Sequence, residues 1–347
     1  MGKVTIYDIA EKLGVSTATV NRALNNKGRI SPKTKKLVIE TANTMGYTAN
    51  KAAKSMARKT IRLAAVMACS FPEFDDKLIY GMNDAFNELR DFNVDFRIFK
   101  SDNSSAKNQL LTTEFLQSSL DTIIGGDFNG VIVFGARNCP EHIKALELAK
   151  QAGLTVATLV TDVPCDRDFH ISPNGELAGR MAAQLLSLCG KNTPVAVFSG
   201  FSDIRIHNDT TRGFVEEAKA WGLELVGVFE NKDNPEYTYE NTRSILTSHP
   251  EIRGIYINSA NSSAVCRQLH DMGLTDKVTV IASDLFPEMK SNLESGAVRA
   301  TLYQNPHQQG FLALKYLYQT VSGEQIHGGD EFISPQIILR GNMDLFD

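Results

Sequence analysis

From residue 61 onward, short apolar runs alternate with longer stretches whose apolar positions recur at helical spacing. This alternation predicts parallel β-sheets whose successive strands are connected by helices. The predicted strands are residues 61–68, 94–100, 130–135, 155–160, 194–200, 225–230, 254–259, 278–283 and 298–303. The predicted helices between them include residues 78–92, 139–153, 174–188, 211–222 and 306–323.

These strands are too numerous for one compact sheet of ordinary size, and their pattern restarts near Pro194. We therefore expect a body, residues 61–347, made of two doubly wound parallel-sheet lobes, with chain crossings near Ser172, Thr301 and Phe332. The N-lobe then comprises residues 61–171 plus 302–331, and the C-lobe residues 172–301 plus 332–347. Ligands bind such sheets beyond the carboxyl ends of the strands, so a ligand is expected in the cleft between the lobes.

The first 49 residues, called the head below, have the pattern of short helices. Ile6, Ile9, Ala10 and Leu13 recur at helical spacing behind a capping residue, Thr5. They predict a helix over residues 6–12, which Gly14 ends.

Ser16 can cap a second helix, and a third is expected from Ser31-Pro32, because proline suits the first helical position. The predicted inward stripe of the third helix is Leu37, Val38, Thr41, Ala42 and Met45. Two helices joined through a glycine turn and closed by a third are typical of a helix-turn-helix, whose second helix enters the major groove. A three-helix cap on a larger domain is the alternative.

Charge is divided unevenly along the chain, and this division favours the helix-turn-helix over a three-helix cap. Residues 1–60 contain 12 Lys and Arg against three acidic residues, a formal charge of +9; because the whole chain is −4, residues 61–347 are −13. A basic head on an acidic body indicates a polyanion bound at one end only. The residues that suit groove reading and phosphate contact are Thr17, Ala18, Arg22, Lys27, Arg29 and Lys33.

Several classes of protein are disfavoured. No apolar run approaches the roughly 18 residues of a membrane helix, and the first residues lack a signal-peptide core, so a cytoplasmic protein without membrane contact is expected. Five widely spaced cysteines without a CxxC pair favour buried free thiols. The sequence has no phosphate loop, nucleophile elbow, zinc-protease pair or dinucleotide fingerprint, and its seven histidines form no ligand-spaced cluster. We therefore expect no catalytic residues, metal or cofactor.

The head also carries a specific set of motifs. These are Thr5-Ile6, Asp8-Ile9-Ala10, Gly14-Val15-Ser16, Thr19-Val20, Arg22, Leu24-Asn25, Ser31-Pro32, Thr34, Gly46-Tyr47 and Asn50. With them, residues 5–57 closely resemble the DNA-binding head of the lactose/galactose repressor family of bacterial transcription regulators. The bodies of that family resemble periplasmic sugar-binding proteins, so the resemblance covers essentially the whole chain.

The resemblance implies roles for residues 1–49, the helix-turn-helix domain. Thr17, Ala18 and Arg22 would face base edges, with Arg22 the best candidate for a guanine. Asn21 stands where the family usually has serine and can alter a backbone contact. The residues that would mainly hold phosphates are Thr5, Ser16, Thr19, Tyr47 and Asn50.

Residues 50–60 resemble the hinge helix of the family, which orders on operator DNA and inserts an apolar side chain into the central minor-groove step. Met56 stands where leucine is usual, and it suits that insertion although it is more flexible. Because a lone eight-residue helix is marginal in water, we expect this segment to be poorly ordered in the free protein.

Polar and aromatic residues just past strand ends are the expected lining of the cleft. Asp284 and Gln304 match the effector-contacting positions of the family best. A carboxylate and a carboxamide on rigid strand ends can bond adjacent hydroxyls, and aromatic rings can cover an apolar sugar face. The predicted effector-binding residues are Ser70, Phe71, Phe74, Asn138, Arg205, Asn261, Asp284 and Gln304, with Arg137, Asp203, His207 and Ser259 as further candidates.

Thr210 departs from the family pattern. The family usually has an arginine three residues before the Gly213-Phe214 pair, where this chain has Thr210. Arg205 or Arg212 can supply a positive charge from another position. Side chains at those positions leave the helix in other directions, so neither is equivalent to an arginine at position 210. This departure favours an effector other than a common hexose or pentose.

Together these features predict a homodimeric, sequence-specific transcription regulator, a repressor of carbohydrate-related genes controlled by a sugar or sugar derivative. Two heads would read the half-sites of a pseudo-palindromic double-stranded operator. Effector would change the relative position of the lobes and thereby operator affinity. The alternatives are a small-molecule-binding α/β enzyme, a transport-type binding protein, which has no use for a basic head, and an architectural DNA binder, which leaves the cleft unexplained.

Overall fold

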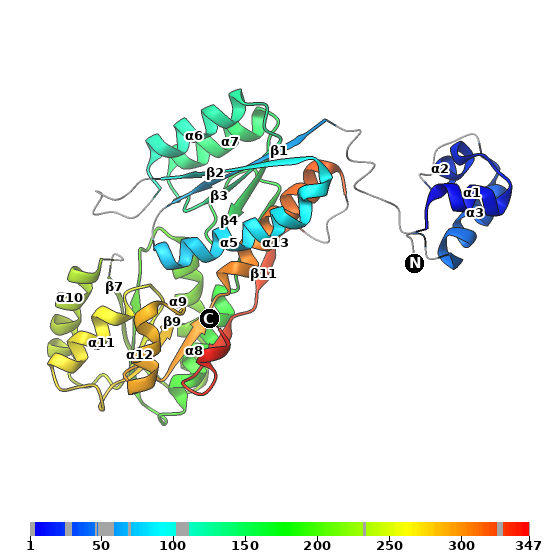
Figure 1. The fold of residues 1–347 in the computed structure, drawn as a ribbon. Helices are drawn as coiled ribbons and strands as arrows, with labels where there is room; N and C mark the ends of the chain where they lie inside the picture. The colour runs from blue at the N-terminus through cyan, green and yellow to red at the C-terminus, as the bar shows by residue number, and fades with distance from the viewer. Residues whose placement is uncertain are drawn as a thin grey trace. The chain divides into compact units, whose positions relative to one another are not determined.

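The computed structural model describes residues 4–24, 30–45, 47, 59–68, 71–101, 111–231, 234–324 and 329–346. They form two compact units, one containing the three helices of the head and the other containing the two sheets of the body (Figure 1). No helix among these residues is long and apolar enough to cross a membrane.

The head consists of α1 (Ile6–Leu13), α2 (Thr17–Leu24) and α3 (Pro32–Thr44). The Thr5 hydroxyl accepts a hydrogen bond from the amide of Asp8 at 3.4 Å, and the Asp8 carboxylate accepts one from the amide of Thr5 at 2.7 Å. The predicted cap of α1 is therefore a capping box.

The other two helix starts are also capped. The hydroxyls of Ser16 and Ser31 accept hydrogen bonds from backbone amides three residues later, at 3.2 and 3.1 Å, as the sequence predicts. In the predicted inward stripe of α3, Val38 and Ala42 are buried as predicted, whereas Leu37 is 50% exposed and its predicted inward position is wrong. The buried core of the head is Ile9, Ala10, Val20, Ala23, Val38 and Ala42.

The N-lobe is a six-stranded parallel sheet in the order β11-β5-β4-β3-β1-β2. Its strands are β1 (Ile61–Met67), β2 (Val94–Lys100), β3 (Gly130–Phe134), β4 (Thr155–Leu159), β5 (Phe169–Pro173) and β11 (Glu331–Ile333). Its helices are α5 (Pro72–Leu89), α6 (Thr113–Gly125), α7 (Pro140–Gln151) and α13 (Pro306–Ser322). Helices cover both faces of the sheet (Figure 1), which is why β3 is apolar and buried at every position.

The C-lobe repeats this plan with the order β12-β10-β9-β8-β6-β7, in which only β12 runs antiparallel to its neighbour among the described strands. Its strands are β6 (Pro194–Ser199), β7 (Glu224–Glu230), β8 (Gly254–Ile257), β9 (Thr279–Ser283), β10 (Ala300–Tyr303) and β12 (Gln336–Ile338). Its helices are α8 (Gly175–Ser187), α9 (Arg205–Ala220), α10 (Pro235–Ser248), α11 (Ser262–Asp271) and α12 (Pro287–Ser295). The predicted fold class, a three-helix head and two doubly wound lobes, is confirmed.

The chain crosses between the sheets after Pro173, after Tyr303 and after Ile333, slightly beyond the predicted points. The sequence pattern does not predict β5, β11 or β12, because these segments are short and interrupted by polar residues or proline. It also starts α5 and α9 too late, because the polar first turns of both helices hide their periodicity.

Each lobe contains one pair of helices whose backbones touch through glycine. A Cβ atom on Gly81 of α5 would lie 1.9 Å from the carbonyl oxygen of His307, and one on Gly179 of α8 would lie 1.9 Å from that of Thr210. These helix pairs, α5 with α13 and α8 with α9, leave no room for any side chain at the crossing. The second pair fixes Thr210 at the edge of the cleft.

We expect Gly179→Ala to destabilise the body by on the order of 2 kcal/mol or more, because the added methyl group forces α8 and α9 apart. Gly125→Ala is the matched control, since a Cβ atom there meets nothing within 4 Å. Thermal unfolding of both variants checks the expectation. Equal melting temperatures would show that the crossing adapts to a methyl group.

Candidate ligand site between the lobes

A cavity of about 1140 Å³, counting its open side, lies where the carboxyl ends of the two sheets face each other. We call it the interlobe cavity. Its N-lobe wall includes Phe71, Phe74, Phe134, Val160 and Thr161. Its C-lobe wall includes Phe201, Ile206, His207, Thr210, Tyr256, Asn258, Ser259, Ser283, Asp284, Phe286 and Gln304.

The structure brings only some of the predicted effector-binding residues to this wall. Those that line it are Phe71, Phe74, Asp284 and Gln304, together with the further candidates His207 and Ser259. Asn138 and Arg205 instead line a separate pocket, and Asn261 is buried at the start of α11. Ser70 lies outside the described residues. Contact with a ligand stays a prediction for all of them.

Several wall residues are absent from the sequence-based set. Thr161 follows the end of β4, and Phe286 lies just past Asp284, so the strand-end rule contains the signal for both. Tyr256 lies inside β8 and Phe134 ends β3. Both lie in apolar runs, so the sequence pattern does not distinguish them from other buried core residues. Their position on the cavity wall is evident only from how the two lobes are arranged in the structure.

Asp284 is held rigidly at the carboxyl end of β9. Its backbone has a positive φ of 62°, and its amide donates to the carbonyl of Leu302 at 2.9 Å. Its carboxylate accepts two hydrogen bonds from Gln304, one from the amide at 3.1 Å and one from Nε2 at 2.5 Å. The two residues that best match the family pattern therefore form one unit.

Burial raises the pKa of Asp284 to about 7, against the hydrogen bonds from Gln304 and the charge of Lys77, which favour the carboxylate. Only 7% of Asp284 is exposed. Burial likewise lowers the pKa of Lys77, whose ammonium group lies 5.5 Å from the centre of the Tyr303 ring. Asp284 can thus present either a carboxyl or a carboxylate near neutral pH.

Thr210 lies on the cavity wall where the helix pair α8 and α9 crosses. Its hydroxyl donates to the carbonyl of Ile206 at 2.8 Å, one turn earlier in α9. Arg205 and Arg212 bind acidic residues outside this cavity, so neither replaces an arginine at this position.

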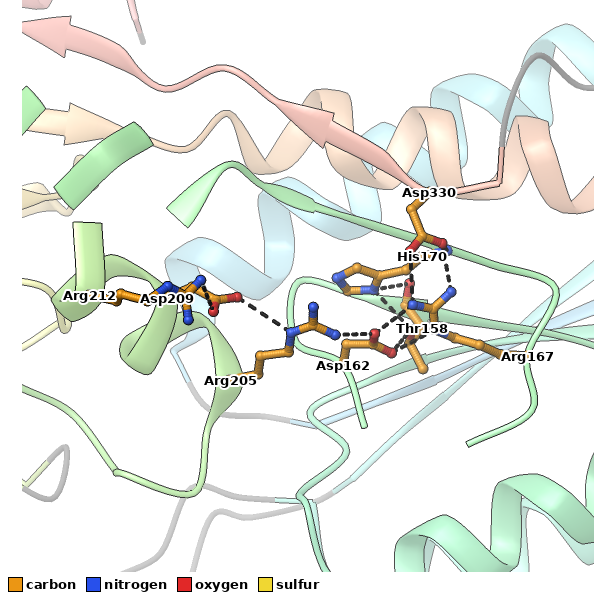
Figure 2. Close-up of polar contacts among 8 residues, drawn as sticks. All are labelled: Thr158, Asp162, Arg167, His170, Arg205, Asp209, Arg212 and Asp330. Atoms are coloured by element: carbon orange, nitrogen blue, oxygen red, sulfur yellow. Dashed lines mark hydrogen bonds and ion pairs between the residues drawn. The ribbon is translucent and has the colours of Figure 1, made fainter. Parts of the chain in front are cut away.

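Beside the cavity, an ion-pair network joins the lobes (Figure 2). Asp162, in the loop after β4, accepts hydrogen bonds from Arg167 Nε and Nη2 at 2.7 and 2.6 Å and from Thr158 Oγ1 at 2.8 Å. From the C-lobe, Arg205 Nη1 at the start of α9 reaches Asp162 Oδ2 at 2.8 Å. Arg167 continues to Asp330, beside the crossing strand β11, at 2.6 Å.

The buried charges of this network are balanced. Burial opposes ionisation of Asp162, but hydrogen bonds from Arg167 and Thr158 and the nearby positive charge hold its pKa below the ordinary value. The carboxylate of Asp162 is 2% exposed and lies within ion-pair distance of two guanidinium groups. Removing Arg167 or Arg205 would therefore leave the buried carboxylate of Asp162 with one fewer neutralising cation.

A second ion pair crosses between the lobes with the opposite polarity. Arg137, after β3 in the N-lobe, donates through Nε to Asp203 of the C-lobe at 2.9 Å and also through Nη2. The guanidinium of Arg137 also lies 5.9 Å from the ring centre of Phe201 on the cavity wall. Both pairs are made only when the lobes lie close together.

In the head, the residues predicted to face base edges lie on α2. Ala18, Asn21 and Arg22 are exposed, whereas Thr17 is partly buried. Of the residues predicted to hold phosphates, Thr5 and Ser16 are exposed and serve as caps, and Thr19 and Tyr47 are partly buried. Asn50 and Met56 lie outside the described residues.

Comparison with known families assigns both parts of the chain. Residues 65–325 match the periplasmic binding protein domain, and residues 5–50 match the bacterial regulatory proteins of the lacI family.

Three named relatives are similar in sequence. The HTH-type transcriptional regulator DegA of Bacillus subtilis strain 168 is 26% identical over 225 residues, 64% of this chain and 63% of DegA, so the match spans less than two thirds of that protein. The ribose operon repressor of the same organism is 22% identical over 82% of each chain. The catabolite control protein A of Staphylococcus epidermidis is 25% identical over 70% of this chain and 71% of its own.

Solved structures share the fold of the body. A glucose-galactose binding protein, GanP from Geobacillus stearothermophilus, superposes with a TM-score of 0.73 at 20% identity, covering 82% of this chain and 99% of GanP. A solute binding protein from Burkholderia graminis, solved in complex with D-arabinose, gives a TM-score of 0.72 at 21% identity, covering 82% and 97%. At this identity the likeness establishes the fold.

The raised pKa of Asp284 predicts a pH-dependent stability. The folded protein binds this proton more tightly than the unfolded chain, so the stabilisation is fully present below the ordinary pKa of 3.8 and is lost as the pH rises through about 7. We expect Asp284→Asn to lose less stability than the parent protein between about pH 5 and pH 8. Melting temperatures across this range, with Asp276→Asn at an exposed position as control, test the sign.

We expect Arg205→Ala to favour a more open arrangement of the lobes by about 1 kcal/mol, a modest effect because the arginine is half exposed. Arg212→Ala is the control, because Arg212 pairs with Asp209 and Glu176 within the C-lobe. Small-angle scattering should give a larger radius of gyration for the first variant only. Identical curves for both variants would remove Arg205 from lobe closure.

Proposed function

The chain belongs to the lacI family of bacterial regulatory proteins, with a periplasmic binding protein domain as its body, and from this premise we propose how it works. It is a sequence-specific DNA-binding repressor of carbohydrate-related genes. It acts in the cytoplasm as a homodimer, and a sugar or sugar derivative in the interlobe cavity sets its affinity for operator DNA.

The observation that carries the proposal is the outer face of α2. The capped turn around Ser16 starts this helix, and its buried face, Val20 and Ala23, packs into the core of the head. The opposite face has the exposed residues Ala18, with a small side chain, Asn21, and Arg22, with a long side chain that carries several donors. A small residue allows close approach to a groove, and an arginine can donate two hydrogen bonds to guanine.

The body supplies the control. Its cavity has one wall on each lobe, so a ligand that contacts both walls binds the closed arrangement more tightly than the open one. Closure forms the cross-lobe pairs of Arg205 and Arg137 and moves one lobe relative to the other. In a dimer, that movement changes the spacing of the two heads and therefore their fit to two half-sites.

The named relatives support regulation of carbohydrate use. The ribose operon repressor and the catabolite control protein A are similar to this chain over 82% and 70% of its length. These relatives are regulators and not enzymes. The sugar-binding proteins of similar fold support a sugar or sugar derivative as the ligand of the cavity.

Selection of random double-stranded DNA by the full-length protein tests the proposal. We expect enrichment of a pseudo-palindrome with two half-sites. Arg22→Ala should then lose about 1–3 kcal/mol of preference for the selected site and relax specificity at one position.

Lys36→Ala is the matched control. Lys36 lies on α3 and pairs with Glu40, so the variant removes one positive charge away from the predicted reading face. It should keep the sequence preference. The absence of an enriched sequence, or an unchanged preference in Arg22→Ala, would contradict the assignment of α2 as the reading helix.

A further inference from the structure

The wall of the interlobe cavity is rich in aromatic rings. Six phenylalanine and tyrosine residues line it, and both lobes contribute. Phe71 at the start of α5 and Phe286 at the start of α12 meet across the lobes, with ring centres 6.1 Å apart. Phe74 and Phe134 form a second pair with ring centres 6.2 Å apart on the N-lobe side.

Most polar side chains on this wall already bind protein groups. Asn258 accepts from the amide of Gly200 at 3.2 Å and donates to Thr211 Oγ1 at 3.0 Å. Ser283 lies 3.3 Å from the hydroxyl of Tyr256, and the Thr210 hydroxyl is taken by a backbone carbonyl. The Asp284 carboxylate is paired with Gln304. Among the described residues, the wall therefore offers few polar side chains that are not already bound to protein groups, whereas a free sugar has many hydroxyl groups.

Two buried hydroxyl groups on the wall, unlike the side chains above, have no protein partner among the described residues. Thr161 Oγ1 and Ser259 Oγ have no hydrogen-bond partner among the described residues, although Thr161 is 6% and Ser259 5% exposed. One belongs to the N-lobe and the other to the C-lobe. A buried hydroxyl without a partner costs free energy, and a polar group of a ligand is a physical means of satisfying it. His207 adds a polar ring to the wall, and its Nδ1 lies 3.2 Å from the carbonyl oxygen of Phe201.

The charges on the described part of the wall disfavour an anionic ligand. Among the described residues that line the cavity there is neither lysine nor arginine, and Asp284 is acidic. Arg205 is engaged by Asp162 and Asp209, and Arg212 by Asp209 and Glu176. Among the described residues of the wall, a sugar phosphate or sugar acid would find no lysine or arginine to pair with, and it would face the buried carboxyl group of Asp284.

We propose that the interlobe cavity binds an uncharged glycoside whose aglycone is an aromatic ring, the class that includes aryl glycosides and nucleosides. The proposal deepens the proposed function and rests on it, since it names the chemical class of the effector. The aromatic aglycone packs against the phenylalanine rings and the adjoining Val160 and Ile206. The sugar part binds the hydroxyls of Thr161 and Ser259, which have no partner among the described residues, and the acceptor sites of Asp284 that Gln304 leaves open.

This assignment follows from comparing two costs. A free hexose would leave several hydroxyl groups buried without partners against phenylalanine, at roughly 1–3 kcal/mol for each unsatisfied group. An aromatic aglycone instead replaces water on apolar surface, which is favourable by about 25 cal/mol for each Å² buried. The same wall thus discriminates against a free monosaccharide and in favour of its aryl glycoside.

Calorimetric titration of the full-length protein tests the class with matched pairs of compounds. The probes are the p-nitrophenyl glycosides of glucose, galactose, xylose and arabinose together with adenosine and uridine, each paired with its parent free sugar; glucose 6-phosphate represents the anions. We expect at least one probe to bind at least tenfold more tightly than its parent sugar, and glucose 6-phosphate not to bind. A free sugar or the phosphate that binds as tightly as every glycoside would overturn the proposal.

Variants then locate the binding. Phe71→Ala should weaken the selected glycoside at least tenfold while keeping the melting temperature that shows a folded body. Phe71→Leu, which keeps apolar volume, should recover part of the affinity. Tyr80→Ala, an exposed ring on the same helix, is the control and should bind like the parent protein. Unchanged affinity in Phe71→Ala would place the glycoside elsewhere and refute the assignment.

Binding to the operator selected from random DNA separates the two levels of inference. If the protein binds its operator and no compound of the panel binds the cavity, the aromatic glycoside is refuted while the DNA-binding role stands. If a glycoside binds but releases or strengthens no operator complex, the ligand class stands and the proposed control of DNA binding fails.

Discussion

A nearly inaccessible carboxylate, that of Asp162, connects the parts of the body that must act together. It lies in the N-lobe, receives Arg205 from the C-lobe, and is tied through Arg167 to Asp330 beside the crossing strand β11. A buried charge of this kind is tolerated only while its cations stay in place. Movement of one lobe relative to the other therefore changes the distance between Arg205 and Asp162, and with it the electrostatic stabilisation of the buried carboxylate.

Helices within each lobe are packed backbone to backbone. Glycine contacts lock α5 to α13 and α8 to α9, so that neither helix pair has space to adjust. Both sheets are covered on two faces and are buried along their central strands. Motion is then expected at the three crossings after Pro173, Tyr303 and Ile333, where a few backbone torsions suffice to move one rigid lobe relative to the other.

The groups that the described cavity wall contains, and those it lacks, support the proposed ligand class. Thr210 replaces a charged side chain with a hydroxyl that the helix itself satisfies, and the arginines nearby are held by acidic residues outside the cavity. Aromatic rings occupy much of the remaining wall. Asp284, with its pKa raised to about 7 by burial, stays as the polar anchor at the end of β9. This lining is the reason for proposing a ligand that is more apolar than a free sugar.

The sequence by itself determined the features that depend on neighbouring residues. The caps at Thr5, Ser16 and Ser31 act within one turn, and long apolar runs predict most of the central strands, so both could be read directly. The strand-end rule likewise placed Asp284 and Gln304 on the cavity wall. Tertiary structure decided the rest. Leu37 faces solvent because three helices share one core, Asn138 and Asn261 lie off the wall because loops and helix starts turn them away, and Arg205 meets Asp162 across two lobes. Interactions between residues far apart in the chain leave no periodic trace in the sequence, because their distance is set by how whole elements pack and not by the spacing of residues along the backbone.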